Sequence, residues 1–341
     1  MKLTLTDAKK LAEDALMAAG ASAFQAAPTA NALVMAEAMG LASHGLSRVG
    51  MYAGHLRHNR VDGQAVPKII TQQPSAALID AADGFAYPAC ELAAETALKM
   101  AENTGMAVAA VTNSHHFGAA GLLLQKIAAA GMVGIALGNS PAAMPFAGGK
   151  RAILGTNPIA AIFPRYVKGQ LVDPVVIDLS LSEVARGKIM VAAKANKPIP
   201  LGWALDSDGN PTTDAAAALK GSMLPFGSGG GGVKGAMLAL MVELLVTSLT
   251  GAHFGSEADS FFQDHGNKPK IAQMMLVINP LALSGKTVYS ERNETLLNAI
   301  LAEGDVRLPG TRRLILLRTA EQNGLEIPEP LFDQIRNIAK V

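Results

Sequence analysis

Cysteine, aromatic residues and long apolar runs are all scarce in this chain of 341 residues. Cys90 is its only cysteine, so no internal disulfide can form, and a reducing cytoplasm is the expected environment. The longest apolar stretch, residues 236–249, is shorter than the ~20 residues that a membrane-spanning helix needs, and Glu243 interrupts it. The first residues turn polar before the apolar segment of a signal peptide could form. We therefore expect a cytoplasmic protein without a membrane partner.

Charge of either sign is also in short supply. Charged residues make up 17% of the chain, and 29 Lys and Arg against 28 Asp and Glu leave a formal net charge of +1. A balance this even creates no field that would attract nucleic acid. Half of the residues are hydrophobic, which provides for a sizeable core and excludes a disordered chain. The expected partners are a small molecule and another subunit.

Strand-like and helix-like segments alternate along most of the chain. Apolar runs with strand character occupy residues 76–80, 106–111, 132–137, 159–163, 175–179 and 272–278. Helices are expected at residues 6–20, 22–40, 88–103, 119–130, 183–194 and 235–249, and from about residues 290, 312 and 330. A short polar segment joins the strands at 159–163 and 175–179, so part of the sheet should be antiparallel. The pattern predicts an α/β fold that is not a simple doubly wound sheet.

Ser43, His44 and Arg48 follow the second predicted helix and are candidates for acid–base chemistry. An imidazole with its ordinary pKa of about 6.5 transfers a proton near neutral pH, and the Ser43 hydroxyl can fix its tautomer. Arg48 offers a planar guanidinium that matches a carboxylate. The alternative is structural, because serine and histidine are common at helix ends, and spacing alone favours that interpretation.

The segment from Asn113 to Ala120 lies between a predicted strand and a predicted helix. Backbone N–H groups gather at such junctions and bind phosphates, so this is a candidate cofactor loop. His115 and His116 could instead suggest a metal site. Adjacent side chains point apart, however, and no nearby Asp, Glu or Cys completes a ligand set. We expect no metal.

A glycine run, Gly227–Gly232, precedes the helix predicted at 235–249. It formally satisfies G-x-G-x-x-G, but the strand before it is poor, and no strand ends in an acidic residue about twenty positions later. Lys234-Gly235 also departs from the P-loop pattern. A flexible loop is the favoured interpretation, although glycines would let the backbone approach a ligand closely.

Six segments, taken in order, resemble the malate/L-lactate dehydrogenase type-2 oxidoreductases, a family that includes sulfolactate dehydrogenases and Δ1-pyrroline-2-carboxylate and Δ1-piperideine-2-carboxylate reductases. The segments span nearly the whole chain, and their order is more specific than any one of them. They are Ala42-Ser43-His44-Gly45 with Arg48, Ser114–Gly118, Gly155–Pro158, Asp178–Ser180, Ala185–Lys188, and Lys234-Gly235 with Leu240–Leu245. Residues 241–251 with Phe254 and Glu257, together with residues 307–313, look closest to the cyclic-imine reductases.

The resemblance implies a fold unrelated to the Rossmann fold and an assembly of two identical subunits. A dinucleotide-binding domain on a mixed, largely antiparallel sheet is expected at residues 116–289. A helical domain formed from both termini is expected at residues 1–115 with 290–341.

The same resemblance assigns roles to individual residues. Ser43 would orient the acid, His44 would donate the proton, and Arg48 and Thr156 would hold the substrate carboxylate. The positions expected to line the cofactor are His116, Phe117, Gly118, Ala119, Ala120, Asp178, Leu179, Ser180, Lys234, Arg292 and Asn293.

The expected reaction is the reduction, by NADPH or NADH, of a C=N or C=O bond next to a carboxylate. Hydride leaves the reduced nicotinamide while His44 protonates the heteroatom. A Δ1-pyrroline-2-carboxylate or Δ1-piperideine-2-carboxylate reductase is the first choice, and a malate or L-lactate dehydrogenase is the alternative. The link at Gly227–Gly232 is longer than the family's usual one, which motivates a hypothesis of another class, a nucleotide-binding protein without catalysis.

Overall fold

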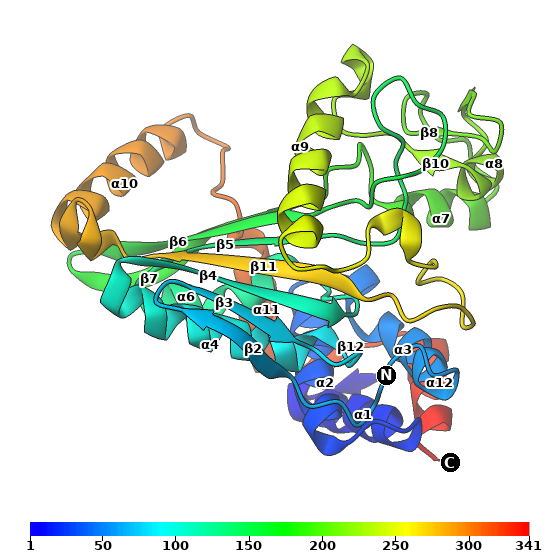
Figure 1. Cartoon of the computed structure of the whole chain (residues 1–341), viewed down its shortest axis with the longest axis horizontal. Coiled ribbons are helices and arrows are strands. Elements are labelled where there is room, and N and C mark those ends of the chain that lie inside the picture. Colours follow the sequence, from blue (N-terminus) through cyan, green and yellow to red (C-terminus); the bar gives the residue numbers. More distant parts are fainter. Residues whose placement is uncertain (341) are drawn as a thin grey trace.

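The computed structural model describes residues 1–340 and is built around one seven-stranded sheet (Figure 1). The strands are β2 (Lys68–Gln73), β3 (Ala76–Asp80), β4 (Met106–Ser114), β5 (Val133–Gly138), β6 (Ile159–Val167), β7 (Gln170–Leu179) and β11 (Ile271–Ile278). Their order is β2-β3-β4-β11-β5-β6-β7. The pair β3 and β4 runs parallel, and every other neighbouring pair is antiparallel. The predicted mixed, largely antiparallel sheet is confirmed, including the hairpin of β6 and β7.

Helices from the two ends of the chain share one core. They are α1 (Leu5–Ala18), α2 (Ala23–Ala38), α3 (Val49–Arg57), α11 (Thr311–Asn323) and α12 (Glu329–Ala339). A short ladder between β1 (Lys2–Leu3) and β12 (Leu325–Glu326) also ties the termini together. Ser22 caps α2 where the sequence predicts it, because its side chain accepts a hydrogen bond from the backbone N–H of Gln25.

An alanine-rich interface attaches α4 (Ala86–Thr104) to the central sheet. Ala89, Ala93 and Ala97 are fully buried there, and their small side chains let the helix approach the strands closely. The short helices α5 (Ala120–Leu123) and α6 (Gln125–Ala129) extend the same layer. In Figure 1 this layer lies below the sheet, next to the helices of the two termini.

A third core lies above the sheet in Figure 1. It gathers α7 (Arg186–Lys194), α8 (Ala215–Lys220), α9 (Val233–Glu243) and a small sheet of β8 (Ala204–Leu205), β9 (Pro211–Thr212) and β10 (Ser222–Met223). The helix predicted at 235–249 is α9 followed by one π-helical turn, η4 (Leu244–Ser248). The remaining long helix, α10 (Gly285–Leu301), lies at the opposite end of the sheet from α3 and α7.

The division into residues 1–115 with 290–341 and residues 116–289 stays a prediction, and so does the distinction from the Rossmann fold. Strands β2, β3 and β4, which precede residue 116, belong to the same sheet as the later strands. None of the helices within residues 1–340 has the length and apolar character needed to cross a bilayer. The cytoplasmic location likewise stays a prediction.

Candidate active site

Two 3-10 turns, η1 (Ala42–His44) and η2 (Leu46–Arg48), place Ser43, His44 and Arg48 before α3. Gly45 joins the turns and packs so closely on Glu37 that a Cβ there would lie 2.2 Å from the carboxylate. The Ser43 hydroxyl lies 3.0 Å from Nδ1 of His44. Arg48 donates from Nε to the carbonyl oxygen of Ser43 at 2.6 Å. The structure therefore brings these three predicted residues together.

His44 stacks on His116, with 5.7 Å between the ring centroids. The Tyr52 hydroxyl lies 2.7 Å from Nδ1 of His116, which fixes the orientation of that ring. Burial lowers the pKa of His44 to about 4; the charge of Arg48 also lowers it, and that of Asp178 raises it. His44 is consequently neutral at pH 7 in the unliganded protein, and an anion placed at Arg48 would raise its pKa.

A second pair of histidines lies behind this one. Nδ1 of His55 is 2.9 Å from Nε2 of His115, and Nε2 of His55 is 3.1 Å from the carbonyl oxygen of Gln263. Burial lowers the pKa of both rings, that of His55 to about 4. Nε2 of His55 also lies 3.3 Å from Nη1 of Arg60, so a guanidinium donor and a carbonyl acceptor compete for this nitrogen. Within residues 1–340, no group of three His, Cys, Asp or Glu side chains is arranged to hold a metal ion.

Thr156 lies beside the predicted cofactor segment Asp178–Ser180. Its carbonyl oxygen accepts from the N–H of Leu181 at 2.8 Å, and its own N–H donates to the Ser140 hydroxyl at 3.1 Å. The carboxylate of Asp178 pairs with Arg313 at 2.7 Å. Because Asp178 also acts on the pKa of His44, the segment borders the cluster around His44.

The segment His116–Ala120 offers a ligand mainly backbone groups. Phe117 and Ala120 are buried in the core under the sheet. Gly118 has a positive φ of 68°, and a Cβ there would lie 2.5 Å from the Tyr87 hydroxyl, so only glycine fits. Among the predicted cofactor residues of this loop, only His116 has a polar side chain, so the others could contact a ligand only through their backbone or through apolar atoms.

Three predicted cofactor residues are not brought to this cluster. Lys234 is exposed in the first turn of α9, and its side chain pairs with no other side chain of residues 1–340. Arg292 and Asn293 lie on α10, which is attached to β6 through Tyr289 and lies far along the sheet from α3 (Figure 1).

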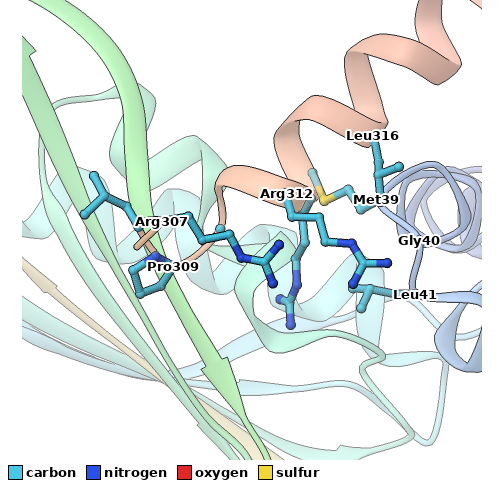
Figure 2. Close-up of a pocket in the computed structure, with 10 residues that line it drawn as sticks. Met39, Gly40, Leu41, Arg307, Pro309, Arg312 and Leu316 are labelled. Carbon is cyan, nitrogen blue, oxygen red and sulfur yellow. The ribbon is translucent and has the colours of Figure 1, made fainter. Parts of the chain in front are cut away.

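Sequence reasoning missed a cavity of about 360 Å³ that three arginines line. Its lining residues are Met39, Gly40, Leu41, Arg307, Leu308, Pro309, Gly310, Arg312, Arg313 and Leu316. Figure 2 shows the side chains of Arg307 and Arg312 extending into the same space. In the part of the chain that the structure describes, neither guanidinium has a carboxylate within ion-pair distance. We call this the arginine cavity, and its charge fits an anion such as a phosphate.

Sequence reasoning also gave no role to Arg186 or to Phe262. The guanidinium carbons of Arg48 and Arg186 each lie 5.3 Å from the centroid of the Phe262 ring. The preceding residue, Phe261, packs on His115 and His116. Two aromatic neighbours therefore cover the histidines and separate two cations.

Arg60 fixes the segment that carries these two rings. Its side chain is fully buried and donates to backbone carbonyl oxygens of that segment. The acceptors belong to Asp259, Ser260, Gln263 and Asn267. Every residue type has a backbone carbonyl group, so no sequence motif could have predicted these hydrogen bonds of Arg60.

The fold and the site together define a class: an α/β protein that places a neutral, half-buried histidine and guanidinium groups without an ion pair in residues 1–340 around the edge of one sheet. Such an arrangement binds small anions and exchanges a proton with them.

Comparisons with known proteins agree with this class. A family model described as malate/L-lactate dehydrogenase matches residues 3–336. A (2R)-3-sulfolactate dehydrogenase (NADP(+)) of Chromohalobacter salexigens is 46% identical over 99% of this chain and 98% of its own length. A Δ1-pyrroline-2-carboxylate/Δ1-piperideine-2-carboxylate reductase of Pseudomonas putida is 35% identical over 99% of this chain and 97% of its own length. The crystal structure of Δ1-piperideine-2-carboxylate reductase from Pseudomonas syringae has a TM-score of 0.91 at 31% identity, covering 99% of each chain.

The chain belongs to the malate/L-lactate dehydrogenase family, as the ordered motifs predict. It is an oxidoreductase, and its relatives include both 2-hydroxy acid dehydrogenases and pyrroline-2-carboxylate reductases.

Proposed function

We propose that this chain uses NADPH to reduce a C=O or C=N bond next to a carboxylate. The observation that carries the proposal is the placement of a half-buried, neutral His44 beside the guanidinium of Arg48. Arg48 has no carboxylate partner within residues 1–340, so a substrate carboxylate would be its counterion.

The arginine cavity supports the choice of coenzyme. Arg307 and Arg312 provide positive charge without a carboxylate counterion in residues 1–340, and arginine commonly accommodates the extra phosphate of NADPH. The relative at 46% identity is named for NADP(+), which agrees with this choice. When bound, the reduced nicotinamide supplies the hydride. The cavity is lined by Met39, Gly40 and Leu41, which lie immediately before η1 and thus close in sequence to His44.

The residues around His44 would then bind the substrate and provide the proton. Arg48 and Thr156 hold the substrate carboxylate, and Ser43 fixes the tautomer of the imidazole through the contact at Nδ1. Neutralising Arg48 removes one of the charges that lower the pKa of His44. His44 thereby becomes a better source of the proton that the reduced oxygen or nitrogen takes up.

Cyclic imines and 2-hydroxy acids are the two candidate substrate classes, and the comparisons reverse the order in which the sequence motifs rank them. The motifs at residues 241–251 and 307–313 favour a cyclic imine, as in relatives at 35% identity. The relative at 46% identity acts on a hydroxy acid according to its name. We therefore place a 2-hydroxy acid dehydrogenase ahead of a Δ1-pyrroline-2-carboxylate or Δ1-piperideine-2-carboxylate reductase.

A reduction assay tests the proposal. Purified protein is given NADPH or NADH with pyruvate, oxaloacetate, 3-sulfopyruvate, Δ1-pyrroline-2-carboxylate or Δ1-piperideine-2-carboxylate, and coenzyme oxidation is followed by absorbance. We expect oxidation of NADPH with at least one of these acids. Tight NADPH binding without oxidation across the whole panel would favour the non-catalytic nucleotide-binding protein instead.

We also propose that the chain forms a homodimer. Exposed apolar side chains on α9 and just after it, Met237, Met241, Leu244 and Leu249, provide a surface that a second copy could cover. Light scattering should give twice the mass of one chain, and a single-chain mass at micromolar concentration would refute the dimer.

A further inference from the structure

Glu243 is a buried carboxylate in an otherwise apolar helix. It is 2% exposed, at the last residue of α9, and the π-helical turn η4 begins directly after it. No Lys, Arg or His of residues 1–340 forms an ion pair with it. A buried carboxylate without a cation is costly unless hydrogen bonds satisfy its oxygens, so its donors show what it holds.

Three N–H donors satisfy Glu243, and they come from three different segments. Oε1 accepts from the backbone N–H of Gly255 at 2.7 Å and from Nδ2 of Asn139 at 3.2 Å. Oε2 accepts from Nδ2 of Asn157 at 2.6 Å. All three donor residues are buried, so water cannot replace a lost bond without structural change.

Two of these segments form the wall that presents Thr156. Asn157 follows Thr156 directly, and Asn139 precedes Ser140, whose hydroxyl accepts from the N–H of Thr156. Asn157 has a positive φ of 39°, a conformation that is uncommon for residues with a side chain and that asparagine adopts more readily than most. The hydrogen bond from Asn157 to Glu243 helps to stabilise this backbone conformation.

The third segment leads to the aromatic cover of the histidines. Gly255 touches Ser140 so closely that a Cβ there would lie 2.7 Å from its carbonyl oxygen. A few residues later the chain reaches Phe261, on His116, and Phe262, beside Arg48. One carboxylate therefore ties together the turn with Thr156 and the start of the segment that covers Arg48.

We propose that Glu243 is a positioning residue that sets the geometry of the carboxylate-binding side of the active site. The inference rests on the proposed function, because it takes Thr156 and Arg48 as the groups that hold the substrate. Glu243 touches neither substrate nor coenzyme; it acts through Asn157, Asn139 and Gly255. The arginine cavity shares none of these bonds, so coenzyme affinity should be insensitive to Glu243.

The test compares binding of two ligands in the full chain by calorimetry. Oxamate, a small carboxylate that cannot be reduced here, is titrated in the presence of NADP+, and NADP+ is titrated alone. Glu243→Gln keeps the size of the side chain but replaces one acceptor with an NH2 donor that, in either orientation of the amide, faces an N–H donor. We expect the Kd for oxamate to rise at least tenfold and the Kd for NADP+ to change less than twofold. The matched control is Thr96→Val, which removes a buried hydroxyl bond within α4 and should change neither Kd.

A second variant covers the case in which Glu243→Gln does not fold. Asn157→Ala removes the bond to Oε2 of Glu243, together with the bond that the same amide donates to the carbonyl oxygen of Ala239, and should weaken oxamate binding in the same way. In the double variant the two losses should be less than additive, because both act through one bond. Unchanged oxamate affinity in either folded single variant, or equal weakening of oxamate and NADP+, would overturn the proposal. A wild-type chain that binds oxamate but reduces no acid would refute the proposed function and leave this comparison standing.

Discussion

Two cationic regions of the molecule meet at Asp178, and they differ in what surrounds their arginines. Beside Arg48 lies His44, which stacks on His116, so an anion bound at Arg48 is next to a group that can move a proton. The arginine cavity has cations, apolar side chains and backbone, and no histidine or carboxylate lines it. The difference teaches that one region is equipped for chemistry and the other only for binding charge.

The largest expected effect separates the two regions by removing the proton donor. His44→Ala should lower kcat for reduction by about 10³, a size typical of lost general acid catalysis. The Kd for NADPH, measured by fluorescence titration, should change less than twofold because the arginine cavity is untouched. Full activity in this variant would remove His44 from the reaction.

The converse variant removes charge from the arginine cavity. Arg312→Gln should raise the KM for NADPH by roughly tenfold or more, the value of one charge-assisted hydrogen bond, with little change in kcat. Steady-state kinetics with both coenzymes check this, and the control is Arg151→Gln, at an exposed arginine that has no ion pair within residues 1–340. A loss in kcat with KM unchanged would contradict the division between the regions.

The pH dependence of reduction sharpens the comparison through Asp178. His44 must be protonated to act, and its pKa in the unliganded protein is about 4, so kcat/KM should fall about tenfold per pH unit above that value. Arg313 lowers the pKa of His44 and pairs with Asp178, which raises it. Arg313→Gln should therefore move the descending limb to higher pH. If the descending limb of kcat/KM stays at the same pH in Arg313→Gln, the arginine cavity does not influence the pKa of His44.

The smallest effect concerns stability. Burial lowers the pKa values of His55 and His115 in the folded chain below the unfolded value near 6.5. Their contribution to the free energy of unfolding is present above pH 6.5 and is lost as pH falls toward 4, by up to ~1.4 kcal/mol per histidine and pH unit. Urea denaturation at pH 7, 5.5 and 4.5 measures this loss. His55→Gln should reduce the slope, whereas Arg307→Gln in the cavity should leave it unchanged.

Local patterns predicted the fold well because the deciding signals are short in range. Ser22 and Gln25 set the start of α2 within one turn, and the hairpin of β6 and β7 shows in one stretch of sequence. Ser43, His44 and Arg48 lie within six residues and two turns, but their spacing alone favoured a structural role, and the family resemblance carried their assignment to the site.

The parts of the site that escaped prediction depend on contacts between distant residues. Arg307 and Arg312 form a cavity only because α11 packs on α2, which brings them to Met39. Arg60 acts on backbone carbonyl groups about two hundred positions away, which carry no residue-type signal. The sequence shows Glu243 as an interruption of an apolar run and as part of one family segment, but its three donors lie in segments that only the fold brings together.

The pKa of His44 gives the most direct test, because the account depends on a substrate carboxylate sitting at Arg48 beside this ring. Nuclear magnetic resonance titration of labelled histidines, assigned with His44→Ala, would follow the ring with and without saturating NADP+ and oxamate. The account predicts a pKa of about 4 in the unliganded protein and a clear rise in the ternary complex. A pKa that is the same in both states, with oxamate demonstrably bound, would contradict it.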